Sequence, residues 1–88
     1  MTAPNPARRR YRCSTGEIEI GVETAEQWHA LAVGLGRPEL AYQGSWDAVR
    51  VADADGPVAR VLEEHFAEEP ADLWIRRLQP PGVPCRVV

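Results

Sequence analysis

The sequence predicts an α+β domain of two layers, in which a small antiparallel sheet of about three strands carries three or four helices on one face. Three observations support this fold class. Residues 17–23 alternate apolar and acidic side chains, residues 24–35 and 57–79 carry apolar stripes at helical spacing, and residues 83–88 alternate again. Each pattern has one apolar side, and two layers packed against each other bury all of them.

The first two strands are expected at residues 10–13 and 17–23, joined as a hairpin. One side of the second strand is aliphatic and the other is acidic, as in a strand with one buried face. Thr15 and Gly16 suit a two-residue turn because glycine supplies the positive φ that such turns need. This turn predicts three facing pairs: Cys13 with Ile18, Tyr11 with Ile20, and Arg12 with Glu19.

Helices are expected at residues 24–35, 57–68 and 70–79. Thr24 followed by Gln27 forms a capping box, and Pro57 suits a first helical turn. The side chains expected to face the sheet are Trp28, Leu31, Ala32 and Leu35 in the first helix, Val58, Val61, Leu62 and Phe66 in the second, and Ala71, Trp74, Ile75 and Leu78 in the third.

The remaining segments are less regular. Residues 37–40 can add one short helical turn, and residues 42–56 fit either a short helix or an irregular flap. The last strand, at residues 83–88, is expected at an edge or strand start because Pro84 has no N–H for a ladder.

Length and composition exclude several classes of protein. The chain has 88 residues, enough for one domain, which we expect over residues 8–88 after a disordered tail over residues 1–7. A formal charge of −3 argues against a nucleic-acid-binding protein, and no apolar run approaches the ~20 residues of a membrane span. Two cysteines are too few for a secreted disulfide framework, which favours a reducing, cytoplasmic location.

The one basic cluster contains Arg8, Arg9, Arg10 and Arg12. It lacks the stacking platforms of a nucleic-acid reader, because the strand alternation turns Tyr11 inward. Glu19 and Glu23 face the cluster across the hairpin and offset part of its charge. We therefore interpret these arginines as solvated cover and expect Arg9→Ala to have little effect.

No metal or catalytic set emerges from the titratable residues. His65 has Glu68 and Glu69 at helical distance, but no third ligand has a matching position, and catalytic zinc needs three. His29, near Glu26, lies off the apolar stripe, so both histidines are expected on solvated or salt-bridged faces. No catalytic residue, metal ligand or cofactor-binding residue is assigned.

The cysteines and tryptophans are expected to be mainly structural. Cys13 and Cys85 are predicted to be buried thiols that face the helices and lie close together if their strands are neighbours. Trp28 and Trp74 lie on helix stripes and supply much of the core. Trp46 lies outside any clear stripe and is a candidate contact for a protein partner.

Three segments together resemble the small domain of family III CoA-transferases, the CaiB/BaiF group: "YRCSTGEIEIGV", "QWHALAVGLGRPELA" and "FAEEPADLWIRRLQPPGVPCRVV". Each motif is weak alone, but their order and spacing are fairly specific and span residues 10–88. The matching positions are Tyr11, Gly16, Ile18, Ile20, Trp28, Leu31, Leu35, Gly36, Pro38, Glu39, Leu40, Phe66, Trp74, Leu78, Gly82, Val83, Pro84, Cys85 and Val88.

The resemblance implies an activity that this segment would share with a larger partner. In such enzymes the small domain covers part of the acyl-CoA site, and the catalytic aspartate belongs to a large domain that these residues do not contain. No catalytic residue is therefore carried over. The chain also departs from the family pattern at Thr15, where aspartate is usual, in the divergent segment 42–56, and in "QPPG"; "MTAPNPA" stands in place of the family's glycine-rich loop.

Two functions stay open from the sequence. The chain can be a split subunit or fragment of a CoA-transferase or acyl-CoA racemase, inactive alone, with CoA or acyl-CoA as the implied ligand and a large-domain subunit as partner. Alternatively, it can be a stand-alone interaction module that kept the fold without catalysis and binds a protein partner or itself. A DNA- or RNA-binding role through the arginines is the remote third.

Overall fold

The structure, a computed structural model, describes residues 5–88. It confirms the predicted fold class, a three-stranded antiparallel sheet with four α-helices. The elements in chain order are β1 (Arg8–Arg12), β2 (Glu17–Gly21), α1 (Ala25–Gly34), the 3-10 helix η1 (Pro38–Ala41), α2 (Ser45–Val49), α3 (Pro57–Phe66), α4 (Ala71–Leu78) and β3 (Cys85–Val87).

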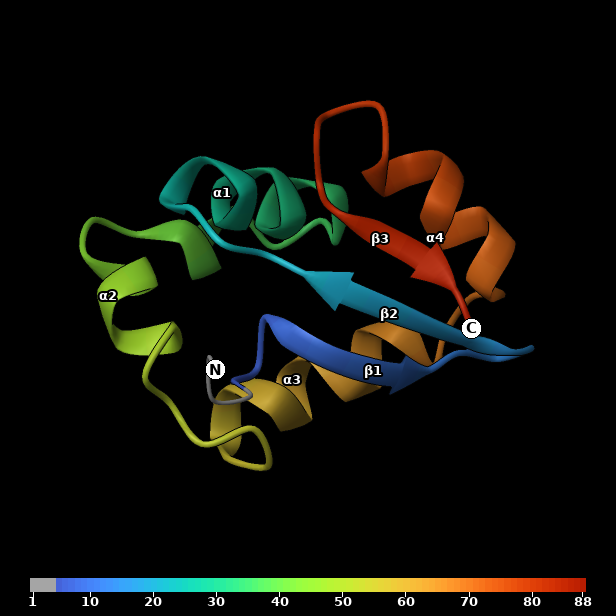
Figure 1. Cartoon of the computed structure of the whole chain (residues 1–88), viewed down its shortest axis with the longest axis horizontal. Helices are drawn as coiled ribbons and strands as arrows, with labels where there is room; N and C mark the ends of the chain where they lie inside the picture. Colours follow the sequence, from blue (N-terminus) through green and yellow to red (C-terminus); the bar gives the residue numbers. More distant parts are fainter. Residues whose placement is uncertain (1–4) are drawn as a thin grey trace.

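The sheet has the order β1-β2-β3, so β2 is central and each outer strand pairs with it antiparallel. In Figure 1 the strands lie in front of α3 and α4, with α1 beside them, and the face turned to the viewer is bare. Ile18 and Ile20 of β2 are 0% and 1% exposed on the covered face. The intervening Glu19 lies on the bare face, as the alternation predicted.

The hairpin register differs from the prediction by two residues. Tyr11 faces Ile18, and Arg10 faces Glu19. The loop spans residues 13–16, with Gly16 at φ +80°, instead of a two-residue turn. The cause is tertiary, because the Ser14 N–H donates to the Glu69 carbonyl and the Ala71 N–H donates to the Thr15 carbonyl, each at 3.0 Å. A shift of two preserves the faces, so the predicted inner and outer sides still hold.

Residues 5–7, expected in a disordered tail, are instead part of the core, and that prediction is wrong for them. Asn5 is 3% exposed and Ala7 is fully buried. The Val22 N–H donates to the Ala7 carbonyl at 2.9 Å, and the Tyr11 hydroxyl donates to the Pro6 carbonyl. These bonds close the end of the sheet beyond β1. The rest of the expected tail, residues 1–4, lies outside the described residues.

The helices begin and end within a few residues of the predicted bounds. The capping box is present, since the Gln27 N–H donates to the Thr24 hydroxyl at 3.1 Å and the Glu23 N–H donates to the Gln27 side chain at 2.7 Å. In the segment with two open alternatives, α2 follows Gly44 at φ +83°. Within α3 the fully buried positions are Ala59, Leu62 and Phe66, whereas the predicted Val58 and Val61 are only half-buried.

An aromatic cluster joins β1, α3 and α4 on the covered face of the sheet. The rings of Tyr11 and Phe66 stack with centroids 4.9 Å apart, and Phe66 meets Trp74 edge to face at 5.2 Å. The Trp74 indole N–H donates to the Phe66 carbonyl at 3.0 Å, which satisfies its polar atom inside the core. The cluster therefore holds the two C-terminal helices to the hairpin.

Burial of Tyr11 predicts a loss of stability at alkaline pH. Desolvation raises the pKa of its phenol well above the ordinary value, and burial also raises the pKa of the Cys13 and Cys85 thiols. Groups whose folded pKa is raised stabilise the fold below their unfolded pKa, and this contribution is lost as the pH rises. Urea unfolding should therefore show a free energy of unfolding that falls from pH 8 to pH 11, and that falls less steeply for Tyr11→Phe than for the unmodified chain. Equal pH dependence in the two proteins would contradict the assignment of this effect to Tyr11.

Candidate functional site

The histidines and neighbouring acids do not form a metal centre. Among residues 5–88 no group of three His, Cys, Asp or Glu side chains lies close enough to hold a metal ion. The His65 ring instead accepts a hydrogen bond from Arg37 Nε at 2.9 Å, and within residues 5–88 it makes none to the carboxylates of Glu68 or Glu69. This matches the salt-bridged or solvated face that the sequence predicted for it. His29 is exposed on α1.

The two cysteines are free, and they are not neighbours. Cys13 is buried beside β1, whereas Cys85 is half-buried on β3, so the prediction of a fully buried Cys85 is wrong. β2 lies between the two strands. Cys85 is less covered because β3 is a short edge strand. No hydrogen bond between a cysteine or serine and a histidine occurs in residues 5–88, and such a bond is one common way to activate a thiol or hydroxyl nucleophile.

The bare face of the sheet carries ion pairs in place of a free basic patch. Glu19 lies between Arg10 at 3.2 Å and Arg86 at 2.9 Å, so the predicted pairing of Glu19 with Arg12 is wrong. Arg8 pairs with Glu23 at 3.2 Å. The hydrogen bond from Arg10, with the nearby Arg86, holds the pKa of the Glu19 carboxyl below its ordinary value. Charge on this face is largely offset, as expected for solvated cover.

Arg9 differs from its neighbours because it lies on the covered side of β1 with Tyr11. Its guanidinium carbon lies 4.4 Å from the centre of the Tyr11 ring. Nη1 donates to the Ala54 carbonyl at 2.9 Å and to Glu63 at 3.0 Å, and it lies 3.6 Å from Asp55. Arg9 thus ties the loop before α3, and α3 itself, to the first strand.

The expectation that Arg9→Ala is nearly silent does not fit these contacts. We expect it to lower the free energy of unfolding by about 1–2 kcal/mol, because a part-buried hydrogen bond to the Ala54 carbonyl, the ion pair with Glu63 and the contact with Tyr11 are lost. Arg10→Ala on the bare face is the matched control and should cost less than about 1 kcal/mol. Thermal melts of both variants test the difference; equal loss would mean that Arg9 does not hold the loop.

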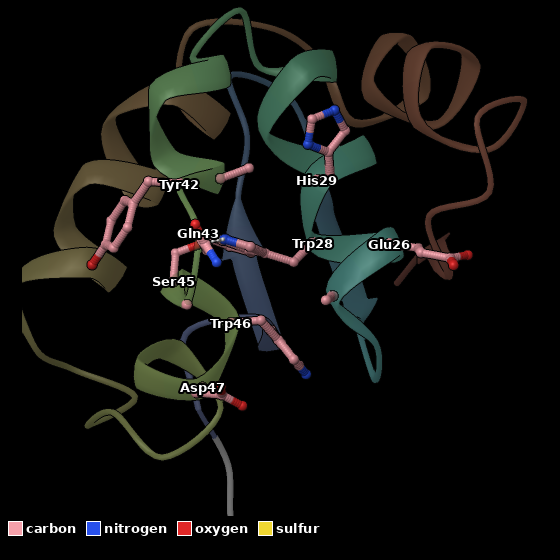
Figure 2. Close-up of a pocket in the computed structure, with 11 residues that line it drawn as sticks. Glu26, Trp28, His29, Tyr42, Gln43, Ser45, Trp46 and Asp47 are labelled. Atoms are coloured by element: carbon pink, nitrogen blue, oxygen red, sulfur yellow. Dashed lines mark hydrogen bonds between the residues drawn. The ribbon is translucent and has the colours of Figure 1, made fainter.

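A first hollow, of about 350 Å³, opens between the start of α1 and the segment from η1 to α2. Figure 2 shows its residues: His29 and Glu26 on α1 point in different directions, and Tyr42 and Trp46 come from the opposite side. The indole N–H of Trp28 at its base donates to the Leu40 carbonyl at 3.1 Å and the Ser45 hydroxyl at 3.0 Å. The polar groups do not converge on one point, so this hollow is not a reactive centre.

A second hollow, of about 340 Å³, also has Trp46 in its lining. Its lining brings together the N-terminal segment, the ends of the first hairpin and α2, and consists of Asn5, Arg8, Val22, Glu23, Trp46 and Arg50. Here the polar groups are mainly hydrogen-bond donors. Trp46, which the sequence analysis named as a candidate contact for a protein partner, is half-buried and lines both hollows.

No helix within residues 5–88 has the length and apolar character needed to cross a membrane.

Comparison with known proteins shows what the chain resembles. The sequence profile of CoA-transferase family III matches residues 2–88. No curated protein matches the sequence.

Solved structures of Rv3272 from M. tuberculosis superpose on the chain. The orthorhombic crystal form is 22% identical, with a TM-score of 0.80, and the match covers 96% of this chain and 24% of that one. An aspartate-to-alanine mutant of Rv3272 is 22% identical with a TM-score of 0.76, and the match covers 92% of this chain and 22% of that one. A third structure, described as the hypothetical protein Rv3272, is 22% identical with a TM-score of 0.75, and the match covers 93% of this chain and 24% of that one.

These likenesses to solved structures show a shared fold, and the chain spans about a quarter of the length of each of them. The family follows from the profile, which covers nearly the whole sequence and agrees with the motifs in the hairpin, in α1 and in α4. The chain belongs to CoA-transferase family III.

Proposed function

We propose that this chain is the small domain of a CoA-transferase of the CaiB/BaiF group and acts with a large domain that supplies the catalytic aspartate. The observation that carries this proposal is the extent of the match. The family profile covers residues 2–88, yet the chain covers only 24% of the structurally similar Rv3272. The large domain can belong to the same polypeptide or to a separate one.

The proposed reaction is transfer of CoA between carboxylic acids, or epimerisation of an acyl-CoA, as the family resemblance implies. The family resemblance assigns the catalytic aspartate to the large domain, which supports a role for this chain in covering the acyl-CoA site and not in bond cleavage. Two free thiols support a reducing, cytoplasmic location.

Reconstitution tests the proposal. The chain is mixed or co-expressed with the corresponding large domain, and transfer of CoA from an acyl-CoA donor to an acid is followed by chromatography of the thioesters. We expect no turnover by the chain alone and turnover by the pair, because the nucleophile and the cover of the site come from different domains.

The large domain alone is the control for this experiment. Turnover by the chain alone would overturn the proposal, as would equal turnover by the large domain with and without the chain. A folded chain that neither binds the large domain nor changes its activity would favour the stand-alone interaction module instead.

A further inference from the structure

The second hollow lies where α2 meets the start of the first hairpin. Figure 1 shows α2 beyond the N-terminal end of β1, with the first described residues between them. Val22, 1% exposed, forms an apolar part of its lining. The Trp46 ring adds an aromatic wall, with its centroid 6.5 Å from that of the buried Trp28. The hollow thus combines two apolar side chains with four polar or charged ones.

Asn5 brings a buried amide to this hollow. Only 3% of the residue is exposed, and its side-chain oxygen accepts the Ala7 N–H at 2.9 Å. Its amide nitrogen, which has two hydrogens to donate, bonds to no group within residues 5–88. No fully buried side-chain nitrogen or oxygen among residues 5–88 lacks a partner, so this nitrogen is not sealed inside the core, and an acceptor in the hollow can reach it.

Two guanidinium groups line the same hollow. Arg8 uses Nη1 to contact Glu23 at 3.2 Å, and Arg50 uses Nε to contact Asp47 at 3.5 Å. A guanidinium has five N–H donors, so each keeps further donors for a ligand. Both side chains are about half exposed, at 44% and 56%, and ion pairs of this kind contribute little and exchange easily. A ligand oxygen can therefore displace either carboxylate from its arginine, or bind to the same guanidinium beside it.

Trp46 gives the ligand a surface for an apolar or aromatic body. The indole N–H groups of Trp28 and Trp74 are satisfied inside the fold, by Ser45 and Leu40 and by Phe66. The indole nitrogen of Trp46 bonds to none of residues 5–88, and in Figure 2 it lies at the outer end of the ring. It is a further donor on a residue that lines the hollow.

We propose that this hollow is a binding site for a small organic carboxylate with an apolar or aromatic body. Arg8, Arg50 and the Asn5 amide bind the carboxylate, and the Trp46 ring packs against the body. The carboxylate at Glu23 repels a dianion such as phosphate more strongly than a singly charged acid. The choice of a carboxylic acid rests on the proposed function, since CoA transfer requires an acid as acceptor.

The test follows the three indole N–H signals of the chain by ¹H–¹⁵N NMR while 3-phenylpropionate is added. The Trp46 signal, identified by its loss in Trp46→Phe, should shift with saturation, whereas the signals of Trp28 and Trp74 should move little. Arg50→Gln should weaken binding roughly tenfold, the loss of about one charge-assisted hydrogen bond. Arg60→Gln changes an exposed arginine on α3 that does not line the hollow; it is the matched control and should bind as the unmodified chain does.

Further probes separate the chemistry of the ligand. Propionate should bind more weakly than 3-phenylpropionate, and the neutral 3-phenylpropan-1-ol should bind more weakly than either acid if the arginines select the charge. An absent shift, an equal shift with the alcohol, or tighter binding of inorganic phosphate would each overturn the proposal. Binding is measured on the chain alone, so failure here would leave the reconstitution result intact, and failure of reconstitution would leave this binding intact.

Discussion

Ile20→Asp is expected to leave most of the chain unfolded at room temperature. Ile20 is 1% exposed on the central strand, and its side chain faces the helices. An aspartate there would have to bury a carboxylate without a partner or remain protonated, and either costs several kcal/mol. A domain of this size has roughly 5 kcal/mol of stability to lose. Far-ultraviolet circular dichroism and urea unfolding measure the result.

Ile20→Val is the control for Ile20→Asp. It keeps the apolar character and the β-branched shape and removes one methylene, so it should cost only about 0.5–1.5 kcal/mol. If the aspartate variant melts at the temperature of the valine variant, the side chain does not face the core, and the assignment of the two faces of β2 is wrong.

Phe66→Ala is expected to have the second largest effect, a loss of about 3–5 kcal/mol. Phe66 is fully buried and is the one ring that contacts both other members of the aromatic cluster, Tyr11 and Trp74. Its removal opens a cavity where β1, α3 and α4 meet. The near-ultraviolet dichroism of Trp74 should fall together with the melting temperature.

Phe66→Leu separates loss of volume from loss of the aromatic contacts. It fills most of the cavity and should recover more than half of the lost stability if packing dominates, because ring–ring contacts add only about 0.5–1.5 kcal/mol beyond burial. An alanine variant that melts within a degree or two of the unmodified chain would show that the cluster does not hold the helices to the sheet.

Elements with a clear periodicity were predictable from the sequence alone. The alternation in β2 identified its buried face, and the stripes of Trp28 and Leu31 in α1 and of Trp74 and Leu78 in α4 are buried as expected. These positions follow from local geometry, since the period of the apolar residues is the period of the element. The capping box at Thr24 is local in the same sense.

Features that depend on residues far apart in the chain were not predictable in the same way. Nothing near Asn5 in the sequence indicates that it is buried, because Val22, Trp46 and Arg50, with which it lines the second hollow, lie far along the chain. The second hollow was missed for the same reason. Arg9 is an exception. It lies two residues before Tyr11 on the same strand, so extending the predicted strand by one residue would have placed Arg9 on the covered face.

The loop at the tip of the hairpin has a consequence for how the chain folds. Its register is held by backbone hydrogen bonds from Ser14 to Glu69 and from Ala71 to Thr15. In each pair the two residues are far apart in the sequence. The local turn residues by themselves favour another register, shifted by two. The first hairpin can therefore settle into its final alignment only when the junction of α3 and α4 arrives, and closing so large a loop is slow. We therefore expect the strands of this domain to reach their final alignment late in folding, together with the docking of α3 and α4.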